Sequence, residues 1–381
     1  MFHLFIIMII THIIKLYNGT QILSCDYYSM LLISKLQLSI GSPYQTVLAS
    51  IDLFLPFSFI RSDLFDLSRS STIEANESTI FNYDNKTYHA VLYSDLTNIE
   101  AKEFTPSLYG YVLYIINRNK SDTLIDNGYG FAFKHHNESF SLVHQLKQNV
   151  FIDRAVFALY LDEPTLNKGT IYFGGVPQEV IEHKNKLTCK VSDEYTPWGC
   201  MLNAIIVNND IININRYSFF QSNEQAIIFP HDIMLRIISS PAIQYYITKG
   251  ICEFREDSSW SYVNCLQSSF YPNNKIEMYF TFDNKGYRFT IDELFYCTPM
   301  VCSSNFYSVQ SKYRDMIIFG NAFLNKYFAE FDYDEKTVSF YSDYTFKTFT
   351  QGRSSKMMLM INSIYLCCFL IIQVIIYIKN K

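Results

Sequence analysis

Short apolar and alternating runs recur along most of the chain, and each is bounded by Asn, Asp, Gly or Pro. Their β-branched and aromatic residues, with breaks every eight to fifteen residues or so, are typical of strands in a mainly antiparallel protein. Helical periodicity is rarer and is clearest over residues 137–147, 231–247 and 292–295. We therefore expect a mainly β protein, with strands at residues 34–40, 47–53, 90–92, 109–116, 156–161, 170–173, 201–207, 275–282 and 337–341.

Two further apolar runs lie near the ends of the chain. The first, from Met1 to about Ile14, has the length of a signal-peptide core and is short for a membrane span. The second, from Met357 to Ile378, contains no formally charged residue and is long enough to cross a bilayer. A buried helix and a removed lipid-anchor signal are the alternatives for this second run.

These runs predict a single-pass type I membrane protein of the secretory pathway or cell surface. We expect a signal peptide, a polar tether, a transmembrane helix and a cytoplasmic tail, at residues 1–20, 347–356, 357–378 and 379–381.

Composition narrows the possible partners. The formal net charge is −5 and no block of Lys and Arg stands out, so we expect no nucleic-acid partner. The pair His135 and His136 has no matching cluster of carboxylates or thiols, so we expect no metal site, and no pattern calls for a cofactor.

Cysteine usage agrees with an oxidising compartment. Of the nine cysteines, all but Cys367 and Cys368 precede the last apolar run, so disulfides are expected, with one cysteine left over, for which Cys25 is the candidate. Glycosylation is also expected, because Asn-X-Ser/Thr motifs occur at Asn18, Asn76, Asn85, Asn119 and Asn137. Asn18 is the exception, since it lies near the expected signal-peptide cleavage site.

Several motifs share a spacing with one known family. Residues 36–46 carry Ile40, Gly41, Pro43 and Gln45 in order, and Asp52 follows after six residues. Together with residues 126–132, 168–176 and 317–332, this segment resembles the pepsin-like aspartic peptidases over most of residues 34–343. The resemblance implies a bilobal β fold, with an N-terminal lobe over 30–185 and a C-terminal lobe over 186–346.

The same resemblance assigns site residues. Asp52 takes the first catalytic aspartate position, and Tyr83 takes the place of the substrate-binding flap tyrosine. The second aspartate is expected after residues 225–228, where the sequence has Phe229. Because catalysis in this family needs two carboxylates that share one proton, we expect an impaired, pseudo-peptidase site that is left to bind polypeptide.

Two other functions remain open on the sequence. One is an active aspartic endopeptidase that pairs Asp52 with Asp232, or with a carboxylate from another region of the chain or from another chain. The other is a surface glycoprotein without a functional cleft. The loop after Asp52 departs from the family as well, because residues 53–56 are Leu-Phe-Leu-Pro where the family has Thr-Gly-Ser-Ser.

The resemblance also implies disulfides. Cys265 matches a family cysteine whose partner here would be Cys297 or Cys302. Cys189 and Cys200 are expected to brace the border between the lobes.

Overall fold

The computed structural model describes residues 22–30, 33–83, 86–99, 101–102, 106–116, 127–134, 141–163, 168–257, 259–267, 276–283, 285–309 and 315–348. The predicted signal peptide, transmembrane helix and tail, and most of the tether, lie outside these ranges. Among the residues that are described, no helix is both long enough and apolar enough to cross a membrane.

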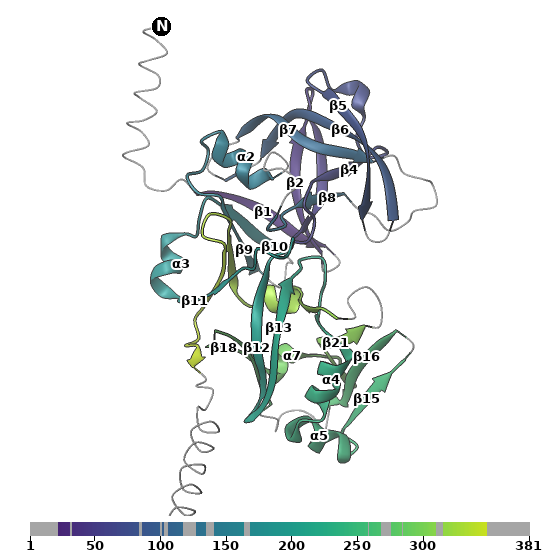
Figure 1. The fold of residues 1–381 in the computed structure, drawn as a ribbon, viewed down its shortest axis with the longest axis vertical. Coiled ribbons are helices and arrows are strands. Elements are labelled where there is room, and N and C mark those ends of the chain that lie inside the picture. Colours follow the sequence, from purple (N-terminus) through teal and green to yellow (C-terminus); the bar gives the residue numbers. More distant parts are fainter. Residues whose placement is uncertain are drawn as a thin grey trace, which may run out of the picture.

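The fold is mainly β and bilobal, as predicted, and consists of two large sheets (Figure 1). The 13-stranded sheet has the spatial order β11 (Asn185–Lys190), β24 (Thr337–Ser342), β23 (Phe328–Asp332), β9 (Val156–Glu163), β10 (Lys168–Phe173), β1 (Leu23–Met30), β2 (Ile33–Ile40), β3 (Gln45–Asp52), β8 (Gly128–Gly130), β4 (Phe59–Arg61), β7 (Ser107–Ile116), β6 (Lys86–Ile99), β5 (Glu74–Tyr83).

The 12-stranded sheet belongs to the C-terminal lobe. Its path is β19 (Phe295–Cys297), β20 (Val301–Ser304), β16 (Trp260–Leu266), β21 (Phe306–Val309), β14 (Ile227–Phe229), β22 (Ile317–Phe319), β13 (Asp210–Phe220), β12 (Gly199–Val207), β17 (Glu277–Phe282), β18 (Lys285–Thr290), β25 (Lys347–Thr348), and β15 (Cys252–Glu256) pairs with β16. The described helices are η1 (Leu67–Arg69), α2 (Leu142–Gln148), α3 (Gln178–His183), α4 (His231–Ile238), α5 (Pro241–Thr248), α7 (Ile291–Leu294) and α8 (Asn321–Leu324).

The lobes meet in a shared part of the first sheet, where β23 from late in the sequence pairs with β9. Phe157 and Phe331 are register partners in this pair, and their rings stack with centroids 4.8 Å apart. Trp198 is fully buried against Phe331, and its indole N–H donates to the Phe131 carbonyl at 2.6 Å. One aromatic core therefore spans the lobe border.

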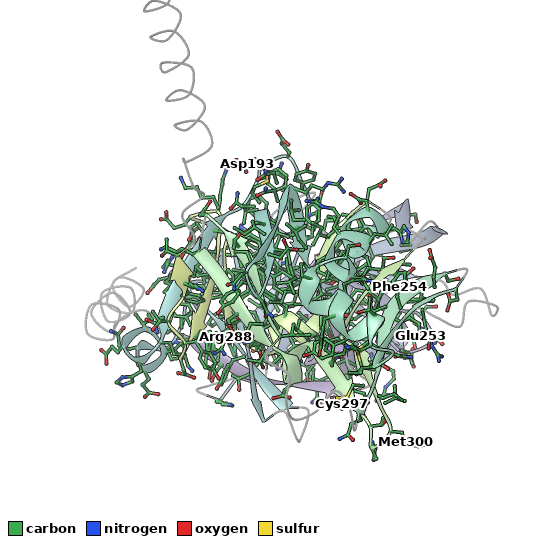
Figure 2. The ribbon with its side chains drawn as sticks, turned by 90° about the horizontal axis from the view of Figure 1, so that it is seen from below. Asp193, Glu253, Phe254, Arg288, Cys297 and Met300 are labelled. Atoms are coloured by element: carbon green, nitrogen blue, oxygen red, sulfur yellow. A yellow bond between two sulfur atoms is a disulfide. The ribbon has the colours of Figure 1, made fainter. Side chains whose placement is uncertain are left out.

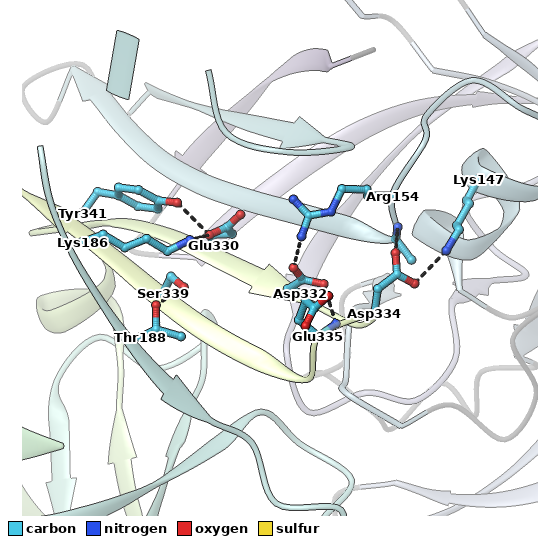
Figure 3. Close-up of polar contacts among 11 residues, drawn as sticks. Lys147, Arg154, Lys186, Thr188, Glu330, Asp332, Asp334, Glu335, Ser339 and Tyr341 are labelled. Atoms are coloured by element: carbon cyan, nitrogen blue, oxygen red, sulfur yellow. Dashed lines mark hydrogen bonds and ion pairs between the residues drawn. The ribbon is translucent and has the colours of Figure 1, made fainter. Parts of the chain in front are cut away.

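Charged side chains fasten the same border, as Figure 3 shows. Lys147 of α2 pairs with Asp334 at 2.7 Å, and Arg154 pairs with Asp332. Burial raises the pKa of the Asp332 carboxyl above its ordinary value, although Arg154 acts in the opposite direction. These pairs join the N-terminal lobe to the turn between β23 and β24.

One predicted helix is divided in two. Residues 231–247 form α4 and α5, which are separated at Ser240. Pro241 is the first residue of α5, and it explains the break because a proline lacks an N–H and disfavours helical geometry in the residue before it.

Three disulfides lie in the described part of the chain. Cys189–Cys200 confirms the predicted bridge at the lobe border. The predicted pairing of Cys265 with Cys297 or Cys302 is wrong, because the bridges are Cys252–Cys265 and Cys297–Cys302. Each bridge joins directly opposed residues of two adjacent strands. These strands are not among those expected from the sequence, so their pairing could not guide the disulfide prediction. The buried Cys25 is in none of the three.

Candidate functional site

Asp52 is the last residue of β3 and is 2% exposed. Its Oδ1 accepts hydrogen bonds from the backbone N–H groups of Phe54 at 2.8 Å and Leu55 at 3.2 Å. An Asp that bonds to N–H groups two and three residues ahead stabilises a tight turn. Asp52 therefore shapes the loop that leads from β3 to β4.

The side chain opposite Asp52 is Gln221, the residue that follows β13 in the C-terminal lobe. Gln221 is 4% exposed, and its Nε2 donates to Asp52 Oδ1 at 3.1 Å. The amide oxygen of Gln221 accepts from the Asn223 N–H at 3.4 Å, which agrees with an orientation that directs the NH2 group at Asp52. An amide and a carboxylate, one from each lobe, thus form the pair.

Strand register shows that Gln221 is the counterpart of Asp52. In the N-terminal lobe, β3 runs parallel to β8 and Asp52 lies opposite Gly130. In the C-terminal lobe, β13 runs parallel to β22 and Phe220 lies opposite Phe319, so the next residues, Gln221 and Gly320, are level. In each lobe a third strand then pairs antiparallel with the middle one: β4 with β8 in the N-terminal lobe, and β14 with β22 in the C-terminal lobe.

The surroundings of Gly130 and Gly320 independently support the equivalence of Asp52 and Gln221. A Cβ at Gly130 would lie 2.6 Å from the carbonyl oxygen of Leu55 and 2.4 Å from that of Phe57. A Cβ at Gly320 would lie 2.4 Å from the carbonyl oxygens of both Glu224 and Ala226. These oxygens belong to the third and fifth residues after Asp52 and after Gln221, so the two loops correspond residue by residue.

Phe229 does not face Asp52, which corrects the sequence alignment. Phe229 is the last residue of β14, lies eight residues after Gln221 and is fully buried. Its ring packs against Phe280 at 6.2 Å and Phe306 at 6.3 Å between centroids. The apolar run that ends at Phe229 is the strand after the loop, whereas its sequence pattern predicts the strand before the loop.

Asp232, the alternative second carboxylate, lies on the surface. It is in the first turn of α4, its side chain is 55% exposed, and it pairs with Arg216 at 3.0 Å. The neighbouring His231 lies 3.6 Å from Glu256. An exposed carboxylate in an ion pair is not placed to share a proton with the buried Asp52.

A second hydrogen bond between the two loops comes from the C-terminal lobe, and it has no counterpart from the matching residue of the N-terminal lobe. Ser222 follows Gln221, is fully buried, and donates from Oγ to the carbonyl of Ile51 in the other lobe. The Ser222 carbonyl accepts from Asn321 Nδ2 at 2.8 Å. The matching residue after Asp52 is Leu53, whose side chain has no donor. The reciprocal bond from the N-terminal lobe is therefore lost.

Phe54 adds an apolar contact between the lobes beside Asp52. Its ring lies edge-on to Phe219 with centroids 6.2 Å apart. It also packs against a buried cluster of the C-terminal lobe formed by Ile228, Val309 and Ile318. A large ring at this position, where the pepsin-like pattern has glycine, fills space against the C-terminal lobe.

The predicted flap is present as a hairpin. Tyr83 is the last residue of β5 and pairs with Lys86, the first residue of β6. The Tyr83 side chain and residues 84–85 lie outside the described part, so the role of Tyr83 in binding stays a prediction. His135 and His136 also lie outside it, and no group of three or more His, Cys, Asp or Glu residues within it is placed to hold a metal ion.

Each lobe contributes one of two corresponding loops, and one side chain from each loop, Asp52 and Gln221, faces the other lobe. This arrangement is the architecture of a pepsin-like protein. The family model described as eukaryotic aspartyl protease matches residues 56–342, so the chain belongs to this family.

Solved structures agree on the fold. Basic 7S globulin from soybean superposes with a TM-score of 0.70 at 12% identity, covering 86% of this chain and 96% of that one. Conglutin gamma, a basic 7S globulin from lupine seeds, gives 0.69 at 12% identity, with coverages of 84% and 95%. An aspartic proteinase from Irpex lacteus gives 0.67 at 12% identity, with coverages of 87% and 99%.

Proposed function

We propose that this protein is a pepsin-like protein without peptidase activity, which binds an extended polypeptide between its lobes. The observation that carries the first half is the 3.1 Å hydrogen bond from the Gln221 amide to the Asp52 carboxylate. The two globulins among the structural neighbours are consistent with a pepsin-like fold that serves more than one purpose.

The chemical reasoning concerns proton transfer. Peptide hydrolysis by a carboxylate pair needs one group to take a proton from water while the other donates a proton to the peptide carbonyl. A glutamine amide neither gains nor loses a proton near neutral or acidic pH, so Gln221 can serve only as a hydrogen-bond donor and acceptor. Asp52 Oδ1 already accepts three N–H donors, from Gln221, Phe54 and Leu55. The pair is therefore suited to hold the loops together rather than to activate water.

The second half of the proposal rests on the fold. A structural neighbour is named an aspartic proteinase, which acts on polypeptide, and the β5–β6 hairpin that would cover such a ligand is present here. Polypeptides bound in extended form are held by main-chain hydrogen bonds to nearby strands, and this needs no catalytic carboxylate. Loss of proton transfer thus leaves this mode of binding possible.

Cleavage assays test the first half. Full-length protein, an Asp52→Asn variant and an active aspartic proteinase as positive control are incubated with a mixed peptide library from pH 3 to pH 7, and products are identified by mass spectrometry. We expect the protein and the variant to give the same background. Cleavage that disappears in Asp52→Asn would show an unrecognised proton-transfer partner and overturn the proposal.

Peptide capture tests the second half. The immobilised protein is exposed to the same library, and retained peptides are compared with those retained by a Tyr83→Ala variant. We expect a set of extended, apolar-rich peptides that the variant retains less well. Equal and negligible retention by both would reject polypeptide binding and favour a surface glycoprotein without a functional cleft.

The proposal includes a location in the secretory route, with residues 357–378 as a membrane anchor. The apolar runs at both ends of the sequence support it, and three disulfides are typical of an oxidising compartment. Carbonate extraction and glycosidase treatment of cells that produce the protein test it. Extraction into the soluble fraction, or no change in mobility after glycosidase treatment, would contradict the anchor or the glycosylation, respectively.

A further inference from the structure

Four cysteines of the C-terminal lobe lie in one row across four adjacent strands. In register, Cys252 of β15 is opposite Cys265 of β16, Cys265 is opposite Cys302 of β20, and Cys302 is opposite Cys297 of β19. Residues directly opposed on antiparallel strands project from the same face of a sheet. The four side chains therefore lie on one face, in the order 252, 265, 302, 297.

The existing bridges join the two outer pairs of this row. Cys252–Cys265 and Cys297–Cys302 each connect opposed residues whose Cα atoms are 3.9 Å apart. The central pair, Cys265 and Cys302, has the same relation in register but carries no bridge between its members. A single bridge at the centre is therefore an alternative pairing that needs no change in strand order.

Access from solvent differs along the row. Cys302, Cys265 and Cys252 are 0%, 2% and 6% exposed. Cys297 is partly exposed and lies at the margin of the molecule near Met300, which is 79% exposed (Figure 2). A thiolate from outside the protein thus reaches the sulfur of Cys297 more readily than the others.

We propose that this row is a thiol–disulfide exchange site that takes an external dithiol as its reductant. The dithiol's thiolate attacks Cys297 Sγ, which breaks the Cys297–Cys302 bond and releases Cys302 as a thiolate. Cys302 then attacks Cys265 Sγ, which forms the central bridge and releases Cys252 as a thiolate.

The last step releases Cys297 and oxidises the dithiol, so that electrons and protons balance. The second thiol of the dithiol attacks its own sulfur in the mixed disulfide, forms the dithiol's internal disulfide and releases Cys297. Cys252 and Cys297 take up the two protons that the dithiol gives up. In total, the dithiol loses two electrons, and the protein exchanges two outer bridges for one central bridge and two thiols.

The exchange changes how the outer strands are held. Among the described strands, β15 pairs only with β16, and β19 is the edge strand and pairs only with β20. Each is covalently tied to its partner in the oxidised form and loses that tie in the exchanged form. The site therefore couples a redox partner to the mobility of both outer strands, independently of the Asp52–Gln221 pair.

Two single variants test the row from its opposite ends. In Cys297→Ser, Cys302 lacks its partner and is expected to attack Cys265, so that Cys252 becomes the alkylated cysteine. In Cys252→Ser, Cys265 is expected to attack Cys302, so that Cys297 becomes the alkylated cysteine. Non-reducing peptide mapping of full-length protein, after trapping with N-ethylmaleimide, should find the Cys265–Cys302 bridge in both.

Controls separate failed folding from failed exchange. The double variant Cys297→Ser/Cys302→Ser should keep Cys252–Cys265 and yield no newly alkylated cysteine in the row. The distant Cys189–Cys200 bridge should stay intact in every variant and reports correct folding.

Treatment of the unmodified protein with a small dithiol completes the test. We expect Cys252 and Cys297 to be alkylated together while Cys265–Cys302 is bridged. Alkylation of Cys297 with Cys302 instead, or single variants that retain the remaining outer bridge with Cys302 or Cys265 alkylated, would overturn the exchange.

Discussion

The Gln221→Glu variant replaces the amide beside Asp52 with a carboxyl group of nearly the same shape. Both positions are almost fully buried, at 4% and 2% exposure, and the atoms concerned are 3.1 Å apart. The change thus converts a hydrogen-bond donor into a like charge without altering volume. The unmodified protein is its matched control.

The expected repulsion between the two carboxylates follows from Coulomb's law. Two unit charges about 4 Å apart, at an effective dielectric constant of about 20, repel by about 4 kcal/mol. This repulsion raises the pKa of the introduced carboxyl in the folded protein above the value that it has in the unfolded chain. Between these values the folded state binds more protons than the unfolded state. Stability therefore falls as pH rises from the pKa of the unfolded chain through the raised pKa of the folded protein, and it stays low above that.

Urea unfolding at pH 4, 5.5, 7 and 8 provides the assay. At pH 4 the introduced carboxyl is protonated and can donate to Asp52, so the variant should be nearly as stable as the unmodified protein. At pH 8 it should be less stable by about 4 kcal/mol. A difference between the two proteins that does not depend on pH would show that residue 221 is not beside Asp52 and would refute the assignment of the pair.

Three further predictions concern a close backbone approach, a hydrogen bond between the lobes and the burial of core tyrosines. Gly320→Ala would place a Cβ 2.4 Å from two backbone oxygens, so we expect a loss of more than about 3 kcal/mol in urea unfolding or a failure to accumulate as soluble protein; normal stability would contradict the close approach. Ser222→Ala removes the donor to the buried Ile51 carbonyl and should cost about 1–3 kcal/mol in the same assay, whereas no loss would mean that the bond adds nothing across the lobes. Burial raises the phenol pKa of three core tyrosines above its ordinary value, so that only the unfolded chain ionises above about pH 10; stability should then fall by roughly 4 kcal/mol per pH unit there, and a flat profile would contradict the burial of Tyr287, Tyr327 and Tyr333.

The sequence located the N-terminal half of the site because its motif survives. Asp52 and Gly130 keep family spacing, and both lie where expected. In the C-terminal half, residues 221–225 retain none of the family's loop residues, and the apolar run that ends at Phe229 has the pattern of the strand before the missing aspartate. A short apolar run does not reveal which of two successive strands it forms.

The spacing between each site residue and the following strand could have identified Gln221. β4 begins seven residues after Asp52, and β14 begins six residues after Gln221. Disulfide partners gave no comparable signal, since Cys252 meets Cys265 only through a strand pairing that spacing alone does not specify.

The pairing of β23 with β9 has a consequence for synthesis of the chain. Strand β9 ends at Glu163, whereas its partner β23 begins at Phe328. Most of the C-terminal lobe lies between the two strands in the sequence. At elongation rates of 5–20 residues per second, the ribosome needs roughly 8 to 33 s to make the intervening segment. During that interval one edge of β9 has no partner, and strand edges of this kind recruit other chains. The nascent N-terminal lobe should therefore depend on chaperones until almost the whole globular part has emerged.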